Sequence, residues 1–274
     1  MGAVRAGLGG RLLLLCLLAA SLYGTPCAAA QKETKPAEPR VVHIFVALCD
    51  NKYQGIHPVP AALGNGQAPS GNLYWGAMYG VKTWFSRQAG WQLVKREKDP
   101  LPYILERVVF KRKGNDLYLV ADAYNGRNMR QCLRDFFRAA SAGLPEVVTL
   151  ETEAGGRVLF AGGRAQLAVF VGHNGLMEIR NLDYPKSVSG TPRQAAVFAC
   201  QSRFFFKGPL AKSGATPLIL TTGNMAPEAY SVDALVTAWS AGQSPEQVRE
   251  AVAQAYHKYQ KCGLSAARRL FVNQ

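Results

Sequence analysis

The sequence predicts an α/β domain with a mostly parallel central sheet and helices on both faces. Continuous apolar runs rich in β-branched residues recur along the chain, as is typical of strands buried inside a parallel sheet. Segments with helical apolar spacing separate many of these runs, and such alternation indicates an α/β architecture. With 48% hydrophobic residues among 274, the chain can build a sizeable core, which excludes a disordered protein.

The N-terminus predicts a secretory signal peptide followed by a tether. A positively charged segment precedes an apolar run at residues 12–18, and small residues at 28–30 form a cleavage site. The run is too short to span a bilayer, and no later segment reaches the roughly 20 apolar residues required. We therefore expect a signal over residues 1–30, a polar tether over 31–40, one domain over 41–274, and export to the periplasm or the extracellular space.

The first part of the domain predicts a strand, a loop and a helix. Residues 41–48 form a buried strand, and residues 51–72 form a loop rich in Gly, Pro and Asn. Loops of this length are uncommon and are usually functional. Asn72 is then predicted to cap a helix with one apolar face, made of Tyr74, Met78, Val81 and Phe85.

The middle of the chain predicts a β-hairpin insertion and an amphipathic helix. A strand at residues 91–95 is followed by strands at 106–112 and 116–124, which flank a hairpin turn at 113–115. Asn128 can cap the next helix. Its apolar residues follow helical spacing and predict a core-facing stripe: Met129, Cys132, Leu133, Phe136, Phe137 and Ala140.

The rest of the domain predicts three buried strands and two closing helices, at residues 167–171, 195–199, 217–222, 226–241 and 244–262. The last helix carries clear boundary signals. Ser244 is its N-cap, Pro245 takes the first position, Gln247 completes a capping box and Gly263 ends it.

Two of these strands end in residues that can carry chemistry. His173 follows the strand at 167–171, and Cys200 follows the strand at 195–199. In parallel sheets, catalysis occurs at the carboxyl ends of the strands. An imidazole there can take the thiol proton, and the thiolate can attack a carbonyl carbon. Backbone N–H groups of Gly175 and Cys200 can bind the developing oxyanion. The plain alternative is a buried, inert or disulfide-bonded cysteine.

These segments carry a family resemblance. Residues 168–175 (AVFVGHNG) and 195–202 (AAVFACQS) resemble the two motif strands of the caspase-like (clan CD) cysteine peptidase superfamily, which includes metacaspases and CHAT domains. Residues 41–66 are similar to the first strand and following loop of that family. Residues 217–256 are similar to the region after the nucleophile in CHAT-type members.

The resemblance implies a three-layer α/β/α sandwich and a peptidase acting on a peptide or protein substrate without a cofactor. It assigns His173 as the base and Cys200 as the nucleophile, with Gly175 or Asn174 contributing to the oxyanion site. It places Asp50 near the pocket for the substrate side chain, where a carboxylate favours a basic residue.

Two features of the sequence depart from the family pattern. Asn174 separates His173 from Gly175, and only 27 residues separate His173 from Cys200. The alternative function is therefore a non-catalytic binding or structural module of the same fold in the cell envelope.

The other histidines and cysteines receive simpler interpretations. His57, in the long loop, can reach the sheet edge and is a second substrate-binding candidate, whereas His43 is predicted to be structural and His257 solvated. Cys132 and Cys262 are the candidate disulfide pair. Neither CxxC nor HExxH spacing occurs in the mature chain, so no metal site is predicted.

The positive charge predicts a property of the surface rather than the chemistry. The formal net charge is +14. Arg130, Arg134 and Arg138, with Arg127 nearby, lie opposite the core stripe of their helix, where they form either a solvated face or a basic ridge. Export argues against nucleic acid as the partner, while association with anionic surfaces stays open.

Overall fold

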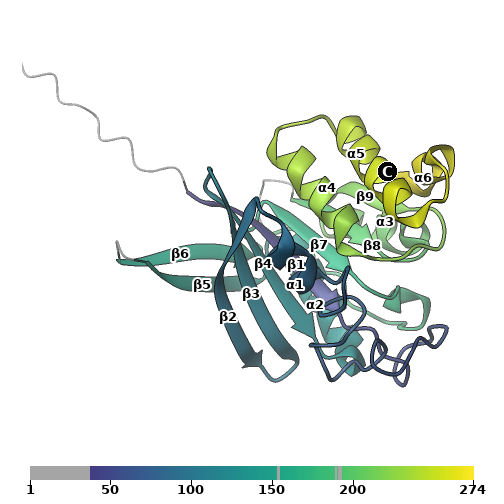
Figure 1. The fold of residues 1–274 in the computed structure, drawn as a ribbon, viewed down its shortest axis with the longest axis horizontal. Coiled ribbons are helices and arrows are strands. Elements are labelled where there is room, and N and C mark those ends of the chain that lie inside the picture. Colours follow the sequence, from purple (N-terminus) through teal and green to yellow (C-terminus); the bar gives the residue numbers. More distant parts are fainter. Residues whose placement is uncertain (1–37, 153–154, 189, 191–192) are drawn as a thin grey trace, which may run out of the picture. The chain divides into compact units, whose positions relative to one another are not determined.

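An eight-stranded, mostly parallel sheet forms the centre of the fold (Figure 1). The computed structural model describes residues 38–152, 155–188, 190 and 193–274. The predicted signal peptide and most of the predicted tether lie outside the described residues. The last tether residue, Arg40, already belongs to the first strand.

The strand order of the sheet is β10-β9-β8-β7-β1-β4-β3-β2. Five strands are mutually parallel: β1 (Arg40–Ala47), β4 (Leu117–Tyr124), β7 (Leu167–Val171), β8 (Gln194–Phe198) and β9 (Thr216–Thr221). Three antiparallel strands extend the edges: β2 (Trp91–Leu101), β3 (Ile104–Arg112) and β10 (Phe271–Val272). The predicted α/β class with a mostly parallel sheet is confirmed.

Helices cover both faces of the sheet, which is compatible with a three-layer arrangement. One face packs against α1 (Val81–Arg87), α4 (Ala229–Ser240) and α5 (Pro245–Gln260), with α6 (Leu264–Leu270) beside α5. The other face packs against α2 (Met129–Ala140) and α3 (Ser202–Lys212). Because apolar layers cover both of its faces, β1 is buried from Val41 to Ala47, which explains its continuous apolar run.

A separate two-stranded sheet covers part of the α2 side. It consists of β5 (Pro145–Thr152) and β6 (Gly155–Gly162), paired antiparallel. Val148 and Leu159 of this pair share a core with Val120 of β4. The strands expected as a hairpin, β3 and β4, do pair antiparallel, but both are members of the main sheet.

The helix expected to begin at Asn72 was placed wrongly. The chain forms turns up to Gly80, and α1 begins only at Val81. Asn72 is fully buried and binds the backbone N–H and C=O of Cys49 instead of capping a helix. A side chain at Gly80 would lie 2.4 Å from the Trp75 carbonyl carbon, so this close backbone approach requires glycine.

The other predicted elements correspond to observed ones, with boundaries shifted by a few residues. The capping box of α5 is present as predicted, with Ser244 and Gln247 exchanging hydrogen bonds. Five elements were not predicted from the sequence: β5, β6, α3, α6 and β10. Two short 3-10 turns, η1 (Gly126–Asn128) and η2 (Gly175–Met177), were not predicted either. In the described part of the chain, no helix combines the length and apolar composition needed to cross a membrane.

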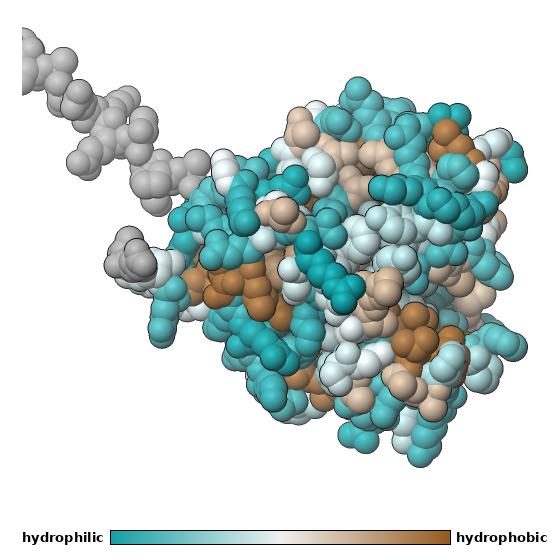
Figure 2. Space-filling view, in the orientation of Figure 1, coloured by the Kyte–Doolittle hydropathy of each residue, from teal (hydrophilic) through white to brown (hydrophobic). Residues whose placement is uncertain are grey.

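The side of the surface shown in Figure 2 is mostly hydrophilic, with separate apolar patches. Ten large hydrophobic residues are exposed among the described residues, and Val188 (70%) and Phe204 (67%) are the most exposed of them. Neither residue contributes to the cores described above.

Candidate active site

His173 and Cys200 lie in neighbouring loops at the same end of the sheet. β7 and β8 are adjacent and parallel, and Val171 pairs in register with Phe198. Each candidate residue comes two positions after the last residue of its strand. Parallel strands with matched ends bring the following loops to one edge, which we call the rim.

A buried amide joins the two loops of the rim. The Asn174 side chain is fully buried, and its Nδ2 donates to the Cys200 carbonyl oxygen at 2.7 Å. Its Oδ1 accepts from the Leu176 backbone N–H at 3.2 Å. Both ends of the amide are therefore engaged, and Asn174 holds the histidine loop against the cysteine loop. This side chain is committed to structure rather than free to bind an oxyanion.

The His173 ring is oriented by a carboxylate that the sequence analysis did not identify. Its Nε2 lies 2.7 Å from Oε1 of Glu178, which also accepts from the Gly55 backbone N–H at 2.8 Å. A carboxylate only accepts, so Nε2 carries the proton and Nδ1 is left as the acceptor of the neutral ring. Glu178 thus links His173 to the long loop after β1. Glu178 lies five residues after His173 in an irregular loop, and no pattern in the sequence marks it as a partner of the ring.

The Cys200 sulfur contacts backbone atoms of a third loop. Its Sγ lies 3.5 Å from the Met225 carbonyl oxygen and 3.4 Å from the Met225 backbone nitrogen. In the described part of the chain, no hydrogen bond joins Sγ to the His173 ring. Cys200 is partly accessible, and α3 begins two residues later, after Gln201 in the left-handed conformation.

The predicted oxyanion glycine is engaged in its own turn. The Gly175 backbone N–H donates to the His173 carbonyl oxygen at 2.9 Å. Gly175 is buried against Met129 of α2, where a Cβ would lie 2.4 Å from the methionine Cγ. The N–H group is therefore directed back into the loop.

Asp50 organises the long loop from the inside. It is 1% exposed, and its Oδ1 accepts from the backbone N–H groups of Lys52 and Tyr53. Its Oδ2 accepts from Gln67 Nε2 at 2.5 Å. This carboxylate, predicted to line the pocket for the substrate side chain, is instead bound by groups of the long loop. His57, in the same loop, is exposed.

A second cysteine and a tyrosine lie buried behind the rim. The Tyr74 side chain and the Cys49 thiol are both buried and interact electrostatically. Burial raises the pKa of Cys49 to about 11, against the lowering effect of the Tyr74 side chain. Burial also raises the pKa of Tyr74 well above its usual value, with Cys49 and Cys200 adding to the effect. Cys49 is therefore a protonated, inert thiol at neutral pH.

The disulfide hypothesis for Cys132 and Cys262 is wrong. All four described cysteines are free. Cys132 is buried in the core on the α2 side of the sheet, while Cys262 is exposed after α5, which packs on the other face. The sheet thus separates the two residues. The described residues also contain no group of His, Cys, Asp and Glu that could hold a metal ion.

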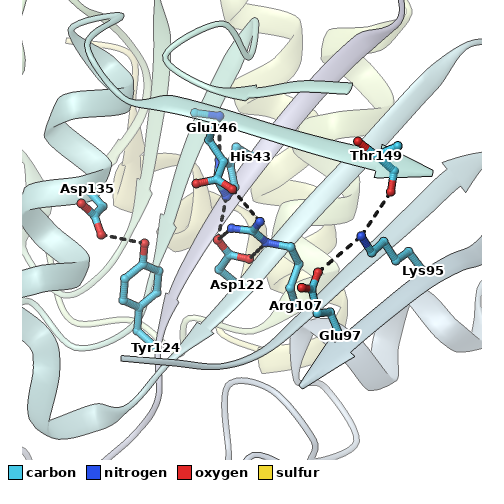
Figure 3. Close-up of polar contacts among 10 residues, drawn as sticks. His43, Lys95, Glu97, Arg107, Asp122, Tyr124, Asp135, Glu146 and Thr149 are labelled. Carbon is cyan, nitrogen blue, oxygen red and sulfur yellow. Dashed lines mark hydrogen bonds and ion pairs between the residues drawn. The ribbon is translucent and has the colours of Figure 1, made fainter. Parts of the chain in front are cut away.

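A second cluster of titratable groups is buried away from the rim, under the β5–β6 pair (Figure 3). Arg107 donates to both carboxylate oxygens of Asp122, at 2.6 and 2.8 Å, and to Glu146 at 2.6 Å. His43 Nε2 lies 3.1 Å from Asp122, and its Nδ1 accepts from the Gly162 N–H. These bonds join β1, β3 and β4 of the main sheet to the covering β5–β6 pair, in keeping with the structural role predicted for His43.

His257 is partly buried rather than fully solvated. Its Nδ1 accepts from the Gly263 backbone N–H at 3.1 Å, and its carbonyl oxygen accepts from Lys261. It therefore helps to close the C-terminal end of α5.

Comparisons of the chain with protein-family models, with curated proteins and with solved structures give no match. Any statement on function therefore depends on the residues and geometry described above.

Proposed function

We propose that this chain is an exported caspase-like cysteine peptidase that hydrolyses peptide bonds with Cys200 and His173. The observation that carries the proposal is the placement of the two residues after adjacent, parallel, matched strands, with their loops joined by the bond from Asn174 to the Cys200 carbonyl. Helices on both faces of the sheet support the three-layer sandwich that this family uses.

The proposed reaction begins with a movement of the Cys200 side chain. Substrate binding releases Sγ from the Met225 backbone and turns it toward Nδ1 of His173, which takes the thiol proton. The thiolate attacks the peptide carbonyl, and the imidazolium returns the proton to the leaving amine. Water then hydrolyses the thioester. The Glu178 carboxylate holds the ring by Nε2 and stabilises the imidazolium that forms between the two proton transfers.

Covalent labelling with an electrophilic peptide probe tests the proposal. The experiment uses a Cys16→Ser, Cys27→Ser, Cys262→Ser background, because Cys16 and Cys27 lie in the predicted signal peptide and Cys262 is exposed, whereas Cys49 and Cys132 are buried. We expect intact-mass spectrometry to show one adduct, at Cys200, and none in Cys200→Ala. His173→Ala is expected to slow labelling by about 100-fold or more.

Glu178→Gln is expected to slow labelling by roughly tenfold, because the amide keeps the hydrogen bond but not the charge. The matched control is Glu97→Gln, a carboxylate on β2 of similar exposure, which should label at the unaltered rate. If Cys200 reacts no faster than a model thiol, or if His173→Ala changes nothing, the peptidase assignment is wrong.

A non-catalytic binding or structural module of the same fold is the second candidate. The observations that favour it are the contacts of Cys200 Sγ with Met225 and the engaged Gly175 N–H. A folded wild type with an unreactive Cys200 would support this module. Labelling that depends on His173 would exclude it.

A further inference from the structure

The layer formed by α2, α3 and the loop between η2 and β8 carries a concentrated positive charge. Within residues 127–140, every exposed position is an arginine. The loop at 179–188 and helix α3 add further exposed cations. Nine exposed basic residues define what we call the basic face: Arg127, Arg130, Arg134, Arg138, Arg180, Lys186, Arg203, Lys207 and Lys212.

The basic face is one continuous surface because the loop lies across both helices. Arg130 of α2 donates to the carbonyl oxygens of Arg180 and Asn181 at the start of the loop. Further along, the Tyr184 ring packs on Phe137 of α2, and Lys212 of α3 lies 5.8 Å from the same ring. The described loop and the two helices therefore form a single outer layer.

The charge of this layer is not neutralised locally. The three segments, residues 127–140, 179–188 and 202–212, contain only two acidic residues, Asp135 and Asp183, so nine cations leave a net charge of +7. Glu178, which precedes the second segment, is bound by His173 and by the Gly55 N–H. Asp135 is buried and lies 3.8 Å from Arg138. Within the described residues, Arg127, Arg134 and Lys207 make no ion pair. Half of the net charge of +14 is thus carried by 35 of the 274 residues.

Two exposed apolar side chains belong to the same layer as the basic face. Phe204 is 67% exposed on the outer side of α3, between Arg203 and Lys207. Val188 is 70% exposed, and its backbone N–H donates to the Ser141 carbonyl oxygen just after α2. Cations combined with apolar side chains at the surface fit a partner with negative headgroups above hydrocarbon. A base-stacking platform would instead need neighbouring aromatic rings.

We propose that the basic face docks on an anionic phospholipid surface, with Phe204 entering the interface between headgroups and acyl chains. Lysine and arginine heads contact lipid phosphates while their stems cover apolar surface. Both α2 and α3 begin at the rim, so docking holds the candidate active site beside the lipid. The docking itself is independent of the proposed peptidase activity.

Vesicle flotation with the full chain tests the proposal. We compare neutral phosphatidylcholine vesicles with vesicles containing roughly 30 mol% phosphatidylglycerol. Each is tested at low and at high salt, with an ionic strength that differs by roughly tenfold. Binding is expected only to the anionic vesicles and is expected to fall with salt. The apolar run at residues 12–18 is common to all variants, so differences between variants report on the basic face.

Three variants separate the sources of binding. The triple variant Arg127→Gln, Arg134→Gln, Lys207→Gln is expected to weaken binding by roughly 100-fold, since each cation near such a surface contributes about 1 kcal/mol. The charge-matched control, Arg87→Gln, Lys98→Gln, Lys113→Gln, alters exposed residues elsewhere and should bind like wild type. Phe204→Ser is expected to weaken binding roughly tenfold.

Several results would overturn the proposal. An equal loss of vesicle binding in the two triple variants would show that binding depends only on net charge. Equal binding of wild type to neutral and anionic vesicles would assign binding to the N-terminal apolar run. Binding to a single-stranded oligonucleotide or to heparin, without binding to anionic vesicles, would assign the face to a different polyanion. Because every substituted residue is exposed, unchanged thermal unfolding confirms that the variants remain folded.

Discussion

At the scale of single residues, the rim depends on one buried side chain. Asn174 satisfies both the Cys200 carbonyl oxygen and the Leu176 N–H. We predict that Asn174→Ala lowers the free energy of unfolding by about 1–3 kcal/mol, because two buried backbone groups lose their partners.

Chemical denaturation measures this loss. The control is Asn224→Ala, which removes an exposed amide from the neighbouring loop and should change stability by less than about 0.5 kcal/mol. Equal stabilities for wild type and Asn174→Ala would show that the amide does not join the loops.

The sequence could predict which two residues lie in neighbouring loops at the rim, but not how these residues are held. A histidine and a cysteine after consecutive apolar strands share an edge whenever the strands are parallel neighbours. Glu178, Met225 and Tyr74 could not be found in this way. Glu178 and Met225 lie in irregular loops without periodicity, and Met225 acts through its backbone. Tyr74 seemed to belong to a helix face.

At the scale of elements, strands were easier to predict than the segments around them. A buried parallel strand needs an apolar run, and that signal depends only on local composition. Helix α3 was missed because Gly208 and Pro209 both disfavour helix. It forms because Ser202, Phe206 and Leu210 fall on one buried face, so tertiary packing overrides local propensity.

The start of α1 gives a prediction at this scale. Gly80 approaches the Trp75 backbone so closely that an added Cβ would lie 2.4–2.6 Å from three of its atoms. Gly80→Ala should therefore destabilise the protein by about 1–3 kcal/mol in urea denaturation. Gly156→Ala in β6 is the matched control, because its nearest atom is an ordinary 3.9 Å away, and it should be neutral or slightly stabilising. If Gly80→Ala were neutral, the tight turns before α1 would not be required.

At the scale of the whole molecule, the order of strands in the sheet could not be predicted from the sequence, because it depends on which strands pair. The sequence gives the strands in chain order, whereas the sheet places β7 beside β1, and β4 on the other side of β1. The antiparallel β5–β6 pair is attached to the main sheet by side-chain hydrogen bonds. β5 and β6 are tied to the main sheet through Glu146 and Gly162, which reach Arg107 and His43. A buried ionic network therefore couples separate layers of the protein.

This coupling predicts how stability depends on pH. Burial disfavours the ionised form of Asp122, but the hydrogen bonds and charge of Arg107, followed by those of His43, outweigh burial and lower its pKa from 3.8 to about 2. A carboxylate with a lowered pKa stabilises the fold fully above its unfolded value, and this contribution is lost as pH falls through 3.8 toward 2. The full contribution is about 2 kcal/mol, of which about 1 kcal/mol is lost between pH 7 and pH 3.

The test compares wild type with Asp122→Asn in denaturant titrations at pH 7, 5 and 3, because titrations common to both proteins cancel in the difference. At pH 7 the variant should be less stable by about 3–5 kcal/mol, since Arg107 loses its main buried partner. The difference should narrow by about 1 kcal/mol at pH 3, where wild type begins to lose the ionised carboxylate. Asp116→Asn, which removes an exposed partner of Arg157, should change stability by less than about 1 kcal/mol. A difference between wild type and Asp122→Asn that stays constant from pH 7 to pH 3 would contradict the low pKa and the coupling of the layers through this carboxylate.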